Sequence, residues 1–243
     1  RTVRISFLDF FCDRTDPLIG IIRIFSSLEY KGPKTQFPSA FTARKDLIHG
    51  QPISLRFFIA TADPTVITVI FAIIGNICKL KNQKIFTDAI KMLPDFNNID
   101  LEFYIIGRIS EKKYYNEIMN NIKGFDNIKY MGEYESSQMK ELYNTIDVVV
   151  CASVEETLSL TIVEGMMNKK VCITSSNTGV AKYINDYING IVFENKDCKE
   201  LSDKMAWVIK NIDKCEEIGE NARKTFDNNF SIESFKKKIS KIF

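Results

Sequence analysis

The pattern of hydrophobic and polar positions becomes regular after residue 65. Short runs rich in β-branched and aromatic residues alternate with longer segments whose apolar residues recur every three or four positions. The runs predict strands at residues 66–74, 101–106, 127–131, 146–151, 170–174 and 190–193. The longer segments predict helices at residues 80–93, 112–122, 136–144, 160–167 and 180–187. This alternation predicts an α/β fold, a doubly wound parallel sheet with helices on both faces.

The two ends of the chain depart from this rhythm. Residues 197–243 favour two or more amphipathic helices, with Phe226, Phe230 and Phe235 as packing anchors. Residues 1–65 show no clean periodicity, and composition changes near their end, because residues 1–75 contain no Asn while the rest of the chain is rich in it. We therefore predict an uncertain N-terminal segment at 1–65 and a Rossmann-like domain at 66–243.

Composition narrows the function classes. A content of 45% hydrophobic and 26% charged residues is typical of a globular protein, and a formal net charge of +2 gives no reason to expect nucleic-acid binding. The six Cys include no Cys-x-x-Cys pair, the chain has a single His, and no Asp-x-Asp occurs. The sequence thus predicts neither a zinc site nor a carboxylate pair gripping a metal–diphosphate complex, and no metal or other cofactor is expected.

The cysteines and the apolar runs also bear on location. Cys78, Cys151 and Cys172 fall in or beside predicted strands, which favours buried thiols and a reducing, cytoplasmic setting. No run of about 18 consecutive apolar residues predicts a membrane-spanning helix. The start does not read as a signal peptide, and because the chain begins at Arg1 rather than Met we expect a fragment or a processed form.

The stretch from Ser153 to Gly165 holds the candidate chemistry. It joins a predicted buried strand to a predicted helix, with Ser159 where a helix N-cap is favoured. Glu156 lies before the helix and Glu164 lies in its second turn, roughly 6–8 Å along the axis from the first free amides. An anion bound at the helix N-terminus would leave Glu164 placed to accept hydrogen bonds from ribose hydroxyls, which predicts a nucleotide-sugar site. The alternative is two solvated carboxylates on an ordinary βα unit.

This stretch resembles the Glu-x7-Glu signature of the GT-B glycosyltransferases, in particular the retaining family 4 enzymes with the pattern Ser-x-x-Glu-Gly-Phe-Gly-x-x-x-x-Glu-Ala. The matching positions are Ser153, Glu156, Thr157, Leu158, Ser159, Glu164 and Gly165. Thr157 and Ser159 stand where the family has glycines. The resemblance covers about residues 66–243 and implies that this part is the donor-binding, C-terminal half of the GT-B fold.

Three further strand-end loops resemble the same family. The loop from Gly75 to Lys81 is similar to Gly-Arg-x-x-x-x-Lys-Gly, with Asn76 in place of the Arg and Asn82 in place of the second Gly. Met131-Gly132 resembles the turn whose backbone contacts the nucleotide base. Residues 175–182 resemble Thr-x-x-Gly-Gly-x-x-Glu, with Gly179 retained and Lys182 replacing the Glu.

The resemblance implies a glycosyltransferase that moves a hexose-like sugar, with retention of configuration, from a UDP- or GDP-linked donor to a glycan or lipid-linked acceptor. Glu156 would face the transferred sugar as the catalytic residue. Donor-binding roles are expected for Gly75, Asn76, Lys81, Met131, Gly132, Leu158, Ser159, Leu160, Thr161 and Glu164. Residues 1–65 would then be a remnant of an acceptor domain, and polysaccharide biosynthesis with peripheral attachment to the inner membrane surface is the expected setting.

The main alternative is a non-catalytic nucleotide-sugar-binding module that serves a partner glycosyltransferase. A third possibility is a sugar epimerase or phosphorylase of the same fold.

Overall fold

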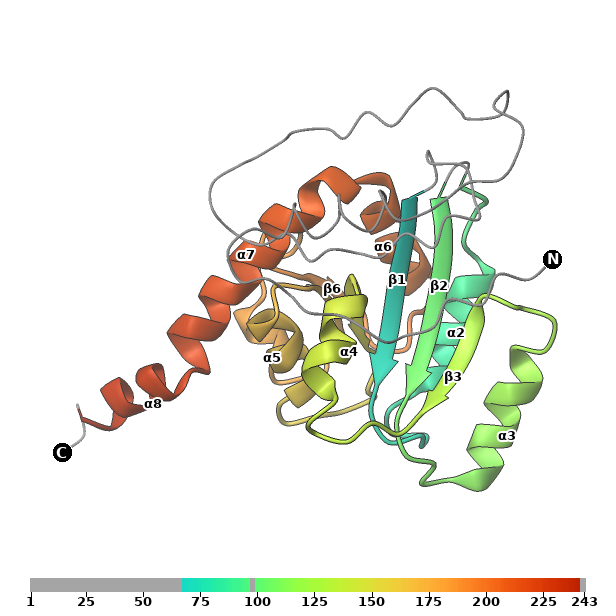
Figure 1. Ribbon diagram of the computed structural model, residues 1–243, viewed down its shortest axis with the longest axis horizontal. Coiled ribbons are helices and arrows are strands. Elements are labelled where there is room, and N and C mark those ends of the chain that lie inside the picture. The colour runs from blue at the N-terminus through green and yellow to red at the C-terminus, as the bar shows by residue number, and fades with distance from the viewer. Residues whose placement is uncertain (1–66, 97–98, 241–243) are drawn as a thin grey trace, which may run out of the picture. The chain divides into compact units, whose positions relative to one another are not determined.

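The structure, a computed structural model, describes residues 67–96 and 99–240; the predicted N-terminal segment lies outside these residues (Figure 1). The strands are β1 (Ile67–Ile74), β2 (Ile99–Ile106), β3 (Ile128–Gly132), β4 (Val148–Cys151), β5 (Val171–Ser175) and β6 (Ile191–Phe193). The helices are α2 (Gln83–Lys91), α3 (Lys112–Asn121), α4 (Met139–Thr145), α5 (Leu160–Met167), α6 (Cys198–Lys210), α7 (Ile212–Asn229) and α8 (Ile232–Ile239), with a 3₁₀ turn, η1 (Ala181–Tyr183).

The six strands form one sheet in the order β3-β2-β1-β4-β5-β6, and every neighbouring pair is parallel. β1 pairs with β2 over its whole length, from Ile67 opposite Ile99 to Ile74 opposite Ile106. On its other side β1 pairs with β4, so the direction of winding reverses between these two strands. The predicted doubly wound parallel sheet is confirmed.

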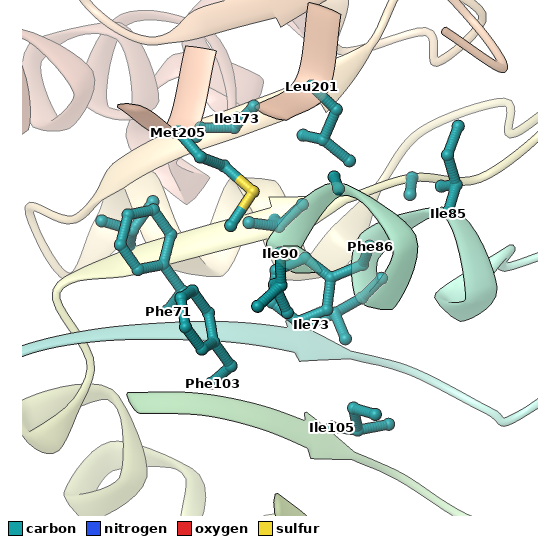
Figure 2. Packing of buried hydrophobic residues seen from close by; sticks show 14 of the residues in the cluster. Phe71, Ile73, Ile85, Phe86, Ile90, Phe103, Ile105, Ile173, Leu201 and Met205 are labelled. Atoms are coloured by element: carbon teal, nitrogen blue, oxygen red, sulfur yellow. The ribbon is translucent and has the colours of Figure 1, made fainter. Parts of the chain in front are cut away.

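Both faces of the sheet are covered, because successive residues of a strand point to opposite sides. Phe71 of β1 packs against Phe103 of β2 with ring centroids 5.5 Å apart, on the face that α2, α3 and α6 cover. Figure 2 shows Phe86 of α2 and Met205 of α6 in this cluster. The opposite face carries a second buried cluster, to which α4, α5 and α7 contribute. The strands are therefore near-continuously apolar, as a sheet buried on both faces requires.

The predicted helix at residues 180–187 is wrong, because the structure has only the single turn η1 there. The side chain of Asn189 takes the backbone groups that a longer helix would pair: its Oδ1 accepts from the Asn185 amide at 2.6 Å, and its Nδ2 donates to the Tyr183 carbonyl at 3.0 Å. Such local side-chain bonds compete with helix formation. Tyr187 then adopts a left-handed conformation with φ 62°, which leads the chain back towards β6.

The predicted helical tail is confirmed as α6, α7 and α8. Phe226 and Phe230 pack against the second cluster as predicted. Phe235 does not, since it is 62% exposed and α8 has no buried residue.

No helix in the described part of the chain is both long and apolar enough to cross a membrane. Cys151 and Cys172 are buried free thiols as predicted, whereas Cys78 is only partly buried.

Candidate functional site

The candidate site lies at the carboxyl edge of the sheet, where the winding reverses between β1 and β4. Open α/β sheets bind ligands in the crevice that such a switch point creates. The loop after β1 and the loop after β4 meet there, and the backbone amide of Val154 donates to the carbonyl of Leu80 at 2.9 Å. The side-chain amide of Asn195 also donates to the Val154 carbonyl, at 3.0 Å. One backbone hydrogen bond thus joins the two loops, and a side chain from the loop after β6 holds the second of them.

Lys81 and Glu156 bring the two loops together in an ion pair. Lys81 Nζ lies 2.7 Å from Glu156 Oε1, and the side chains are 26% and 18% exposed. The other oxygen, Oε2, accepts a hydrogen bond of 2.8 Å from the hydroxyl of Ser153, which is fully buried. Both carboxylate oxygens of Glu156 are therefore engaged. The family resemblance implies Lys81 at the diphosphate and Glu156 at the sugar, and these roles stay predictions; the structure shows that the two side chains contact each other directly.

Helix α2 begins at Gln83, later than the predicted start at residue 80. The reason is that Asn82 has a left-handed backbone, with φ 53° and ψ 42°, which is not helical. Glycine adopts this conformation without cost and asparagine adopts it more readily than most residues, which explains why Asn82 can stand where the family has glycine. Asn76 is exposed, and its carbonyl accepts from Nε2 of the buried Gln83 at 2.8 Å. The backbone at Asn76 is held while its side chain faces solvent.

The N-terminus of α5 is open. Ser159 occupies the N-cap position as predicted, but its side chain makes no capping hydrogen bond and lies 3.1 Å from the Thr161 hydroxyl instead. The first hydrogen bond of the helix runs from the Val163 amide to the Ser159 carbonyl. The amides before Val163 therefore have no hydrogen-bond partner within the helix. The first turn carries no acidic residue. Free amides and the positive end of the helix dipole favour an anion at this position.

Glu164 lies on the second turn of α5, and Tyr143 of α4 contacts it. The Tyr143 hydroxyl donates to Glu164 Oε2 at 2.8 Å, and the carbonyl of Thr161 lies 3.3 Å from the same hydroxyl. Burial, reinforced by the Glu164 carboxylate, raises the pKa of Tyr143, so this hydroxyl stays protonated. Sequence reasoning missed Tyr143, because nothing in a short amphipathic helix marks one tyrosine as the partner of a glutamate on another helix.

The loops after β2 and β3 complete the edge. The Gly107 amide donates to the Gly132 carbonyl at 2.8 Å, and the Tyr130 hydroxyl donates to the Gly107 carbonyl at 2.8 Å. Gly107 must be glycine, because a Cβ there would stand 2.0 Å from the carbonyl oxygen of Gly75. Met131 is exposed at the end of β3. The predicted donor-binding positions of three loops therefore lie along one edge.

A polar cavity of about 420 Å³ opens beside Glu156. Its lining comes from the loops after β4 and β5: Glu155, Glu156, Thr157, Ser176, Asn177, Thr178 and Gly179. The Gly179 amide donates to the Glu156 carbonyl at 2.8 Å, and a Cβ at this glycine would stand 1.8 Å from the Thr157 carbonyl oxygen. Gly179 thus permits the close approach that shapes this cavity. Lys182 is exposed on η1, with its amine over the Tyr183 ring at 5.1 Å.

The chain resembles known proteins in sequence and in structure. The family model described as glycosyl transferases group 1 matches residues 66–225. An uncharacterized glycosyltransferase of Methanocaldococcus jannaschii is 26% identical over 172 residues, which cover 70% of this chain and 46% of the relative. A glycosyltransferase structure from Rickettsia africae ESF-5 superposes with a TM-score of 0.64 and 26% identity, covering 72% of this chain and 47% of that one.

A further solved structure, HepE of Anabaena in complex with UDP and glucose, has a TM-score of 0.65, and the match covers 72% of this chain and 48% of that chain. At 19% identity this likeness shows the fold alone. The chain spans less than half the length of each of these three proteins.

Proposed function

The chain belongs to the glycosyl transferases of group 1, and from this premise we propose that it transfers a sugar from a nucleotide-diphosphate sugar to a glycan or lipid-linked acceptor. The GT-B resemblance expected from the sequence is confirmed; membership of family 4 within it stays a prediction. One observation carries the proposal: the open N-terminus of α5, with Glu164 on its second turn, lies at the switch point beside the Lys81–Glu156 pair.

The proposed donor site uses each part of this edge for one part of the donor. The amides from Leu158 to Thr161 bind the diphosphate, with Leu160 and Ser159 contributing backbone only. Lys81 adds a point charge to the phosphates, and Gly75 and Asn76 flank them. Glu164 accepts hydrogen bonds from the ribose hydroxyls. The backbone of Met131 and Gly132 contacts the base, which we propose to be uracil or guanine; backbone contacts with the base do not choose between them.

The proposed reaction retains the anomeric configuration. Negative charge grows on the departing diphosphate, where the α5 dipole and Lys81 stabilise it, and this phosphate helps to deprotonate the acceptor on the same face of the sugar. Glu156 faces the transferred sugar from the edge of the polar cavity. Because Lys81 is already paired with Glu156, a bound diphosphate shares this cation with the carboxylate. The pair thereby orients Glu156 while the donor is bound.

Two further parts of the proposal concern residues 1–65, as part of an acceptor domain, and helix α8, as a membrane attachment. We propose that residues 1–65 are the remnant of an acceptor domain, separate from 66–243; limited proteolysis with mass spectrometry tests this by cleavage near residue 65. Helix α8 supports peripheral attachment to the inner, cytoplasmic surface of a membrane, because Ile232, Phe235 and Ile239 are exposed and its last turn carries three lysines. Flotation with anionic vesicles, compared between the chain and Phe235→Ser, tests the attachment.

A non-catalytic donor-binding module is the second candidate, because Asn76, Thr157 and Ser159 replace an arginine and two glycines of the family pattern. Calorimetry with UDP-glucose, UDP-N-acetylglucosamine and GDP-mannose first establishes whether a donor binds. Release of UDP or GDP is then measured with the chain and with Glu156→Gln. Donor binding with turnover that Glu156→Gln abolishes supports the enzyme. Donor binding without any turnover favours the module, and no donor binding rejects both.

A further inference from the structure

Tyr143 carries a polar group into an apolar cluster. It is 2% exposed, and the same buried cluster contains Ile146 and, from α5, Ile162 and Met166. A hydroxyl in such surroundings is costly unless it is hydrogen-bonded. Its short bond goes to Glu164 Oε2 at 2.8 Å, while the Thr161 carbonyl is farther away at 3.3 Å. The buried ring therefore delivers a single donor to one oxygen of the glutamate.

The consequence for Glu164 is a fixed orientation. A glutamate side chain has several rotatable bonds and loses considerable conformational freedom when it is ordered. The bond from Tyr143 holds one oxygen before any ligand arrives. Within residues 67–96 and 99–240 no donor pairs with the other oxygen, Oε1, so these residues leave it available to accept hydrogen bonds from a ligand. An acceptor held in advance binds more tightly than one that must be ordered on binding.

We propose that Tyr143 is the positioning residue that holds Glu164 for the ribose hydroxyls of the donor nucleotide. The inference rests on the proposed function, because it assumes that Glu164 meets the ribose. Tyr143 itself is too buried to touch the donor. It acts through Glu164, and its removal should weaken recognition of the ribose hydroxyls while leaving recognition of the phosphates intact.

The test compares two nucleotides that differ only in the groups Glu164 would bind. Calorimetry on the full chain measures the affinities of UDP and of 2′,3′-dideoxyuridine diphosphate, with the GDP pair used if GDP binds better. We expect the chain to prefer the ribonucleotide by about 10- to 100-fold, the range for hydrogen bonds to a charged group. Tyr143→Phe should reduce this preference at least about threefold, with the dideoxynucleotide affinity changed less than about twofold.

Two further variants make the result specific. Tyr104→Phe is the matched control, because the Tyr104 hydroxyl also donates to a glutamate, Glu102, away from the site. It should leave the preference unchanged. Substitution of Tyr143 by 4-fluorophenylalanine fills the space of the hydroxyl without donating, and it provides the measurement if Tyr143→Phe does not fold.

The possible results distinguish failure of the Tyr143 positioning role from failure of the proposed donor site. Glu164→Ala should abolish the preference; if it does not, or if no nucleotide binds, the proposed donor site fails. If Glu164→Ala abolishes the preference but both Tyr143 variants retain it, only the positioning role is rejected. An equal loss of affinity for the two nucleotides in the Tyr143 variants also rejects it, because a merely structural role would weaken both alike.

Discussion

Lys81 Nζ and Glu156 Oε1 lie 2.7 Å apart although 75 positions separate the two residues in the chain. The pair joins the loop after β1 to the loop after β4 at the place where the winding of the sheet reverses. Both side chains retain partial exposure, so water screens the interaction and the pair itself adds little to stability. Its main consequence is positional, because it places a cation and a carboxylate together beside the open N-terminus of α5.

The first prediction concerns this cation. Lys81→Ala should weaken UDP binding by about 1–2 kcal/mol, roughly 5- to 30-fold, because a charge-assisted contact to the diphosphate is lost. Uridine, which has no phosphate, should bind almost unchanged. Lys84→Ala is the matched control, since Lys84 pairs with Asp88 one turn along α2. Calorimetry with both ligands measures the effect, and equal losses for UDP and uridine would reject the phosphate role.

The second prediction concerns the close approach at Gly179. A Cβ at this position would meet the Thr157 carbonyl at 1.8 Å, so Gly179→Ala must displace the backbone of one loop. We expect a loss of about 2 kcal/mol or more in the free energy of unfolding, measured with urea. Gly124→Ala is the comparison: its φ is +89° but nothing lies within 4 Å, so it should cost only about 1 kcal/mol. A smaller loss at Gly179 than at Gly124 would contradict the argument.

The sequence predicted the sheet well because its strands are buried on both faces and read as unbroken apolar runs, such as that ending at Ile74. It also predicted that the loop after β4 and the start of α5 carry Glu156 and Glu164, since their spacing is local; their roles stay predictions. The sequence could not predict which side chains contact one another in the folded chain. The bond from Tyr143 to Glu164 joins two helices, and the short turn η1 depends on where the Asn189 side chain folds back.

The third prediction concerns acid stability. The hydroxyl of Tyr104 and then Lys129 lower the pKa of Glu102 below its usual value. A carboxylate whose pKa is lower in the folded state than in the unfolded one contributes stability that is complete above the unfolded pKa and is lost as the pH falls through the folded pKa. Glu102→Gln should therefore destabilise the chain at pH 7, by about 0.5 kcal/mol because solvent screens the group, and less at pH 3.

Urea unfolding at the two pH values measures this difference. Glu217→Gln, on an exposed part of α7, removes the charge of a glutamate elsewhere on the surface and is the control. A destabilisation by Glu102→Gln that is the same at pH 3 and pH 7 would show that the charge of Glu102 is not the source.

The last prediction restores the cation that the family pattern has at Asn76. The backbone there is fixed by the bond from Gln83 to the Asn76 carbonyl, and the side chain is exposed, so an arginine can be accommodated without strain. If the diphosphate lies between this loop and α5, the guanidinium can donate two hydrogen bonds to it. Asn76→Arg should then tighten UDP binding by about 1 kcal/mol, roughly fivefold, and leave uridine unaffected. The gain should shrink as salt is raised, because the contact is exposed.

Asn76→Gln lengthens the side chain without charge and should give no gain. Unchanged UDP affinity in Asn76→Arg, or an equal gain for uridine, would place the diphosphate away from this loop and leave the α5 N-terminus as its main binding element.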